Sequence, residues 1–173
     1  MLALSLGTLL VIAVLLIGGW MAWAALRPGP EGFPLSSGEA AGVPGEVTDA
    51  LQYTIDARSR QEWAYFDFSS GTSVSTTQDT LDWDLAFRRN DLITNGGETN
   101  PVGAGGAVDL GDVSLEEAVV PADGYLSDVI DESEGIENPA LDKWYKYSWA
   151  THVISSRNHT YAVRTATGES ALL

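Results

Sequence analysis

The sequence predicts a mostly β protein, in which an antiparallel β domain follows one N-terminal transmembrane α-helix. Residues 1–26 contain no charged side chain, and all 9 Lys or Arg and all 24 Asp or Glu come after them. Short runs of alternating apolar and polar residues, separated by turn residues, fill the rest of the chain from about residue 50. Only one short segment among them has a helical signal, which indicates strands joined by turns rather than alternating strands and helices.

Residues 1–26 are predicted to form the transmembrane helix. A helix of this length measures about 39 Å, which exceeds a hydrocarbon core of ~30 Å. Trp20 and Trp23 lie near its C-terminal end, where an aromatic belt is expected. Close packing against other membrane helices would use a set of small residues, Ala3, Ser5, Gly7, Gly18 and Gly19. The alternatives are a plain lipid-facing helix and a signal peptide cleaved at Ala22-Trp23-Ala24, although no basic residue precedes the apolar run.

Residues 27–46 are predicted to form an extended tether. Almost half of them are Pro or Gly, a composition that resists both helix and sheet. Phe33 and Leu35 are the apolar residues by which the tether would dock on a partner. The alternative is that the tether packs along its own domain.

Residues 47–173 are predicted to form the acidic β domain. The clearest alternation runs from Leu81 to Arg88 and places Asp82 and Asp84 on the solvent face. Residues 95–107 are rich in Gly and are expected to form a loop, while 114–118 are expected to start a short helix. The other predicted strands cover residues 51–55, 63–68, 143–154, 159–165 and 169–173, with a turn at 155–158.

The charge and composition exclude several classes of function. A formal net charge of −15 is repelled by phosphate backbones, so no nucleic-acid partner is expected. The chain has no Cys, which excludes disulfides, Fe–S clusters and covalently attached haem. No catalytic residue is predicted, because no nucleophile motif is present. Asp82 and Asp84 would share one face of a strand, which makes acid–base chemistry conceivable, but their alternation with core aromatics indicates a solvent face instead. We therefore predict a protein that is not an enzyme and needs no small-molecule substrate.

The two histidines, His152 and His159, are the candidates for cofactor contacts. A turn at 155–158 would make them diagonal neighbours on one sheet face, about 7 Å apart, which is too close to hold a haem between them. No bound cofactor and no metal site are therefore predicted, with haem contacts from His152 and His159 as the alternative. The acidic residues 131–137 lack the spacing of an EF-hand and indicate a solvated loop.

Several sequence blocks together resemble the HmuY-like family. These blocks are Trp63-Ala64-Tyr65-Phe66, Trp83 to Arg89, Thr94-Asn95-Gly96-Gly97, Gly103 to Ala107, Trp144 to Tyr147, and Tyr161 to Gly168. The resemblance implies a largely β domain outside the cytoplasm, and some family members bind haem as bacterial haemophores. Family members are typically lipoproteins or secreted and extend further beyond the Gly168 position. The haem ligands vary within the family and lie outside the matched blocks, so none is transferred to this chain.

The sequence favours an accessory, non-catalytic subunit of a larger bacterial membrane complex. The apolar helix would pack among other membrane subunits in the lipid bilayer, and the β domain would dock on the periplasmic side of the inner membrane. A photosynthetic reaction centre with antenna, or another energy-transducing complex, is the expected host. The alternative is a membrane-anchored haem- or tetrapyrrole-binding module.

Overall fold

The computed structural model describes residues 6–25, 50–133 and 135–173. The chain divides into two compact units, Met1–Phe33 and Pro34–Leu173. The first unit contains helix α1 (Leu6–Ala25). Within the described part of the chain, no helix combines the length and the apolar character needed to cross a membrane. The predicted transmembrane helix is thus not supported, although its helical conformation is present.

The predicted packing residues of the first unit are only partly described. Gly7, Gly18, Gly19 and Trp20 lie in α1 and are exposed, and no atom would meet a Cβ placed on either Gly18 or Gly19 within 4 Å. Trp23 belongs to the same helix. Ala3, Ser5, Phe33 and Leu35 lie outside the described residues.

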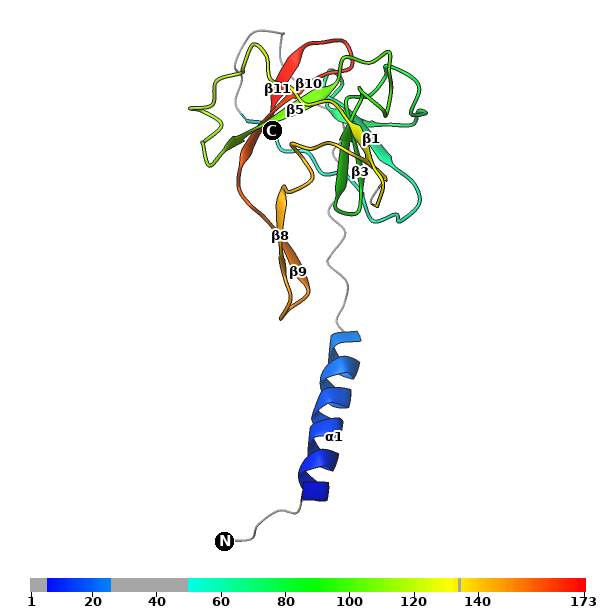
Figure 1. The fold of residues 1–173 in the computed structure, drawn as a ribbon, viewed down its shortest axis with the longest axis vertical. Helices are drawn as coiled ribbons and strands as arrows, with labels where there is room; N and C mark the ends of the chain where they lie inside the picture. The colour runs from blue at the N-terminus through cyan, green and yellow to red at the C-terminus, as the bar shows by residue number, and fades with distance from the viewer. Residues whose placement is uncertain (1–5, 26–49, 134) are drawn as a thin grey trace. The chain divides into compact units, whose positions relative to one another are not determined.

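The second unit contains two antiparallel sheets (Figure 1). The first has, in spatial order, β2 (Thr72–Val74), β1 (Ala64–Asp67), β3 (Leu85–Arg88) and β4 (Asp91–Thr94). The second has β11 (Ser170–Leu172), β10 (Thr160–Arg164) and β5 (Gly106–Gly111). The mostly β, antiparallel fold class is therefore confirmed.

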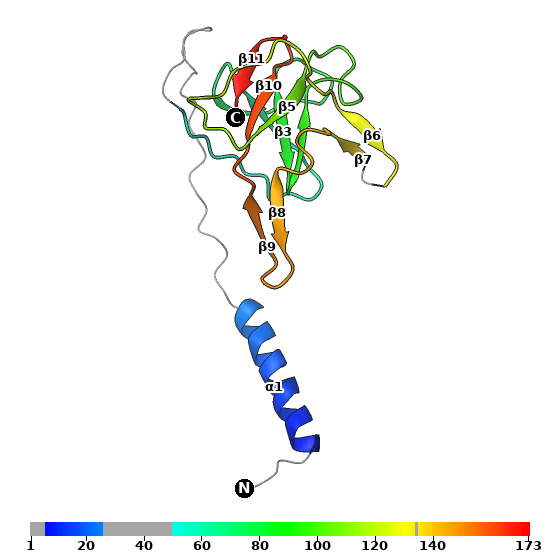
Figure 2. The ribbon, with the colours of Figure 1, turned by 60° about the vertical axis from the view of Figure 1, so that its left-hand side comes forward.

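Two further hairpins extend from these sheets. One pairs β6 (Val129–Asp131) with β7 (Gly135–Glu137), and the other pairs β8 (Tyr145–Ser148) with β9 (Val153–Ser156). Figure 2 shows both hairpins projecting from the body of the domain. The β8–β9 hairpin follows Trp144 and ends at Ser156, and both of these residues line the candidate site.

The main apolar cluster draws residues from both sheets. Its buried members are Leu85, Leu92, Ala107, Leu141, Tyr161 and Val163. A second cluster, formed by Trp83, Ala86 and Ile93, lies against partly buried side chains that include Trp63 and Ile136. Because β3 contributes to both clusters, this strand is covered on its two faces at Leu85 and Ala86.

The prediction that Asp84 faces solvent is wrong. Asp84 is 5% exposed, and its carboxylate accepts hydrogen bonds from the backbone N–H groups of Phe68 and Ala166, each at 2.9 Å. Burial raises the pKa of this carboxyl, while the two backbone hydrogen bonds act in the opposite direction. Asp84 thus links the end of β1 to the segment that follows β10.

The predicted strand at 143–154 and the turn at 155–158 are also wrong. The chain reverses earlier, at residues 149–152, so that β9 pairs back onto β8 with Tyr147 opposite Ile154. His152 occupies the left-handed region with φ 55°, and its backbone N–H closes the turn on the Ser148 carbonyl at 2.8 Å. As a result, His152 lies in a hairpin turn while His159 precedes β10, and they are not diagonal neighbours in one sheet.

Two smaller elements differ from expectation as well. Residues 51–55 form no strand, and the predicted helix at 114–118 is a single turn in which Ser114 O accepts from the N–H groups of Glu117 and Ala118. The Gly-rich loop is found over residues 95–105, while Gly106 and Ala107 already belong to β5. A Cβ on Gly105 would lie 2.4 Å from the backbone carbon of the fully buried Asn95, so close backbone approach explains this glycine.

Candidate functional site

A pocket of about 390 Å³ opens between the two sheets of the domain. Its size falls within the range of small-molecule sites. Most of its wall is apolar, and Leu92, Leu141 and Tyr161 belong to the main apolar cluster. The complete lining is Ala57, Phe87, Arg89, Leu92, Leu141, Trp144, Ser156, His159, Tyr161 and Leu173.

Side-chain and backbone hydrogen bonds fix the wall that Trp144 and Arg89 contribute. The Trp144 indole donates from Nε1 to the Asn90 carbonyl at 2.8 Å, and Asn90 Nδ2 donates to the Tyr145 hydroxyl at 3.0 Å. Arg89 adopts φ 61° and donates its N–H to the Ala57 carbonyl at 2.7 Å. The β3–β4 turn is thereby tied to the base of the β8–β9 hairpin, so the pocket wall is preformed.

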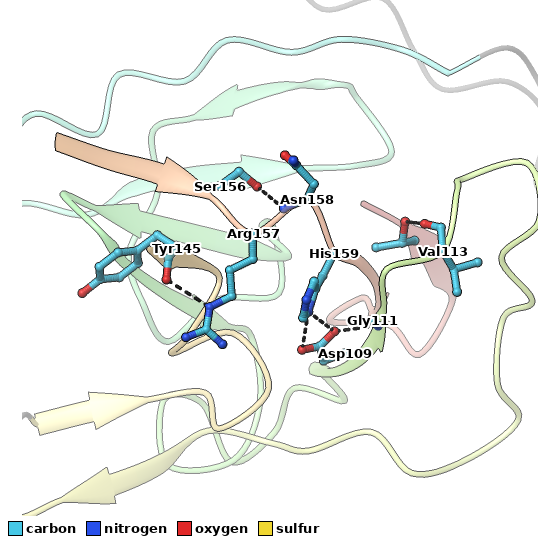
Figure 3. Close-up of polar contacts among 9 residues, drawn as sticks. Asp109, Gly111, Val113, Tyr145, Ser156, Arg157, Asn158 and His159 are labelled. Carbon is cyan, nitrogen blue, oxygen red and sulfur yellow. Dashed lines mark hydrogen bonds and ion pairs between the residues drawn. The ribbon is translucent and has the colours of Figure 1, made fainter. Parts of the chain in front are cut away.

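His159 brings an imidazole into this apolar lining, and Figure 3 shows its ring beside the Asp109 carboxylate. Its Nδ1 lies 3.0 Å from each carboxylate oxygen of Asp109 on β5. Because Nδ1 is engaged by Asp109, the remaining ring nitrogen Nε2 is the atom that can accept a proton or bind a metal. A carboxylate behind the opposite ring nitrogen is the usual support of a metal-binding histidine, since it fixes the tautomer and raises basicity.

A β-bulge aims Asp109 at His159. Between Thr160 and Tyr161 the register of β10 against β5 shifts, so that Thr160 pairs with Gly111 and Tyr161 with Asp109. Gly111 adopts φ 79°, and its backbone N–H donates to Asp109 Oδ1 at 2.8 Å. Bulges of this kind turn a side chain out of the regular ladder. The local sequence Asp109-Leu110-Gly111 therefore sets the direction of the carboxylate.

Tyr161 supplies a second polar group to the lining. The residue is 6% exposed, and within the described part of the chain its buried hydroxyl has no hydrogen-bond partner. Burial raises the pKa of this phenol, the Asp109 charge raises it further, and Arg157 opposes the shift. A buried polar group without a partner is costly, and a bound ligand that reaches the hydroxyl would relieve that cost.

The two predicted candidate histidines therefore have different surroundings. His159 lies in the pocket, whereas His152 lies in the exposed hairpin turn with Nδ1 at 2.5 Å from the Tyr147 hydroxyl. Sequence reasoning named neither Asp109 nor Tyr161 as a site residue. In the sequence, Asp109 is marked only by the glycine two residues after it, and this pattern is too common to identify a site.

A match to known proteins adds to this geometry. The family model described as HmuY protein matches residues 59–173. This chain belongs to the HmuY family. A comparison with curated protein sequences finds no match.

Solved structures share the fold of this HmuY domain. A protein of Bacteroides vulgatus ATCC 8482, described as an HmuY-like heme binding protein, is 23% identical with a TM-score of 0.51, covering 68% of this chain and 76% of that chain. A protein of Bacteroides fragilis NCTC 9343, described as a lipoprotein, is 20% identical with a TM-score of 0.50, covering 68% and 74%. The apo HmuY analogue of Tannerella forsythia is 16% identical with a TM-score of 0.51, covering 72% and 87%.

These comparisons overturn the predicted role in a membrane complex. The family match covers nearly the whole β domain, and the solved relatives are HmuY-like proteins, one of them described as heme binding. The prediction of an accessory subunit of a photosynthetic or other energy-transducing complex is therefore wrong. An apolar N-terminal segment and an acidic domain are compatible with many functions, so neither feature identifies a subunit of a membrane complex.

Proposed function

We propose that this HmuY-family chain is a haem-binding module that holds its ligand in the pocket beside His159. The observation that carries the proposal is the imidazole placed in an apolar lining with Nδ1 fixed by Asp109. The function described for the Bacteroides vulgatus relative supports the same ligand class. A bound haem would supply an iron centre as cargo, and the protein's part is binding rather than catalysis.

The residues of the pocket fit the parts of a haem. Phe87, Leu92 and Trp144 offer apolar surface for a flat macrocycle. Arg89 is an exposed cation of the lining and suits a propionate carboxylate. His159 Nε2 and the unpartnered Tyr161 hydroxyl are two protein groups able to ligate iron, as His and Tyr do in other haem proteins. This set favours the haem-binding alternative over the expectation of no cofactor.

Titrating the purified full chain with ferric haem tests the proposal. We expect a saturable shift of the Soret band at one haem per chain, because iron gains a nitrogen ligand in an apolar site. Metal-free protoporphyrin is the matched control, since it can use the apolar walls but offers no iron to His159. A Soret band that stays unshifted and does not saturate would contradict the proposal.

We also propose that the domain works outside the cytoplasm. The Bacteroides fragilis relative is described as a lipoprotein, and the absence of Cys matches either a reducing or an oxidising compartment. We expect protease added to intact spheroplasts to cleave the β domain, as an extracytoplasmic domain is reachable from outside. A cytoplasmic enzyme in the same spheroplasts is the control, and protection of the β domain equal to that control would refute this location.

A further inference from the structure

We propose that the β8–β9 hairpin is a docking surface for an anionic lipid bilayer. We call residues 143–157 the basic hairpin. This inference does not depend on haem binding, because its apolar contacts lie at the tip of the hairpin, whereas Trp144 and Ser156 at the base line the pocket. Four observations support it: exposed aromatic residues, local positive charge, separation from the acidic body and a fixed base.

The tip of the basic hairpin exposes large apolar side chains. Trp149 is 83% exposed, and Tyr147, Val153 and Ile154 are 46%, 55% and 43% exposed. Tyr147 and Trp149 stack edge to face with ring centroids 6.2 Å apart, so the tip carries a small aromatic cluster. Contiguous exposed apolar groups of this kind mark interaction surfaces.

The basic hairpin also carries the opposite charge to the rest of the chain. From Lys143 to Arg157 the sequence contains three basic residues and no acidic one, while the whole chain has a net charge of −15. Both lysines of the chain, Lys143 and Lys146, are in this segment and are exposed. Basic residues near a bilayer surface gain attraction from anionic headgroups.

The acidic body does not prevent such a contact. Four-residue strands at about 3.3 Å per residue hold the hairpin tip roughly 13 Å from its base. Charges separated by more than about 10 Å are largely screened at 0.1 M salt. Both ribbon views show this hairpin projecting from the sheets (Figures 1 and 2). The tip and Lys146 in β8 can therefore approach headgroups, while the charges at the base, Lys143 included, are damped together with those of the acidic body.

The base of the hairpin is rigid enough to present the tip. Arg157 donates its backbone N–H to the Trp144 carbonyl at 3.0 Å and its Nε to the Tyr145 carbonyl at 3.2 Å. The Trp144 indole is itself bonded to the β3–β4 turn. An isolated two-stranded hairpin is only marginally stable in water, so these contacts fix its direction.

Trp and Tyr together with Lys are the combination that favours a bilayer interface over an acidic protein surface. Aromatic rings with a polar edge concentrate at the headgroup level of membranes. Basic residues flanking an apolar surface of this type are typical of proteins that lie on anionic membranes. An anionic bilayer can take up the apolar tip and attract the lysines, whereas an acidic protein surface would account only for the lysines.

A fluorophore at the tip tests this proposal. Because the chain has no Cys, Thr151→Cys gives a single labelling site for an environment-sensitive dye in the exposed turn. We expect a blue shift on adding vesicles of phosphatidylglycerol and phosphatidylcholine, and none with phosphatidylcholine alone. This readout reports the environment of the tip itself rather than binding of the whole chain to lipid.

Two variants and one control separate the outcomes. In the labelled chain, Trp149→Ala or the double change Lys143→Glu and Lys146→Glu should weaken the lipid affinity by about tenfold or more. A label at Val119→Cys, an exposed position in an acidic stretch, should not shift. No shift at Thr151→Cys with anionic vesicles, or an unchanged affinity in the charge-reversed variant, would overturn the proposal and leave an acidic protein as the better partner.

Discussion

Replacing His159 with Ala should weaken haem affinity by more than about 100-fold and remove the shift of the Soret band. Loss of an outer-shell partner of a metal ligand costs about 10- to 100-fold in affinity, and loss of the ligand itself should cost more. His159 is the pocket residue whose free ring nitrogen can reach a metal, since Nδ1 is bonded to Asp109 at 3.0 Å. Equilibrium titration of the full chain, followed by absorbance, measures the effect.

His152→Ala is the matched control for this prediction. It removes the other imidazole of the chain from the exposed hairpin turn and should leave haem affinity unchanged. Asp109→Asn should give an intermediate loss of about 10- to 100-fold, because it removes the carboxylate that orients the imidazole. If His159→Ala keeps the native Soret band while His152→Ala loses it, His159 is not the ligand and the pocket is assigned wrongly.

The positions of these two histidines show where sequence reasoning failed. Residues 155–158 contain Ser and Asn and look like a turn, whereas Trp149 to His152 contains no Gly, Pro, Asn or Asp. The chain nevertheless reverses at the second segment, because His152 takes the left-handed conformation that such a turn needs. A non-glycine residue at positive φ is uncommon, and the enrichment of His in that region is too weak to locate a turn in the sequence. The misplaced turn put His152 beside His159 in the predicted sheet, so the distance between the two imidazoles looked too short to hold a haem.

The strands were easier to predict than the site. The aromatic run at 63–68 and the apolar residues around Phe87 correspond to β1 and β3. Burial does not alternate along β3, however, because Leu85 and Ala86 are both buried. Asp109 and His159 are 50 residues apart in sequence and meet only through the register of β10 on β5. Register depends on the whole fold, so neither their contact nor the bulge at Gly111 is visible from local pattern.

Replacing Asp128 with Ala should lower the free energy of unfolding by at least about 3 kcal/mol. Asp128 is 2% exposed, and its carboxylate accepts hydrogen bonds from the hydroxyls of Thr94 and Thr99, the Thr94 N–H and Asn138 Nδ2. Removing it would leave these buried donors unsatisfied, each at a cost of about 1–3 kcal/mol. Urea denaturation of the full chain, monitored by tryptophan fluorescence, measures the change.

Two further variants give this prediction its control. Asp82→Ala removes an exposed carboxylate of the same domain and should change stability by no more than about 0.5 kcal/mol. Asp128→Asn keeps the volume and one acceptor oxygen, so it should cost less than Asp128→Ala. Because burial raises the pKa of Asp128, the neutral form is less disfavoured there than in water, which makes an amide more tolerable. Equal stability of Asp128→Ala and Asp82→Ala would show that the network is dispensable.

The Asp128 network also reaches the proposed haem site. Asn138, held by Asp128, accepts the N–H groups of Leu141 and Asp142 at its carbonyl and that of Ala140 at its side chain. This turn positions Leu141 and Trp144, which line the pocket. Asp128→Ala should therefore reduce haem affinity even under conditions where the chain stays folded, whereas His159→Ala should reduce haem affinity without lowering stability to the same extent. We expect Asp128→Ala to have the larger effect on stability and His159→Ala the larger effect on haem affinity. This difference would distinguish a residue that supports the pocket from one that binds the haem iron.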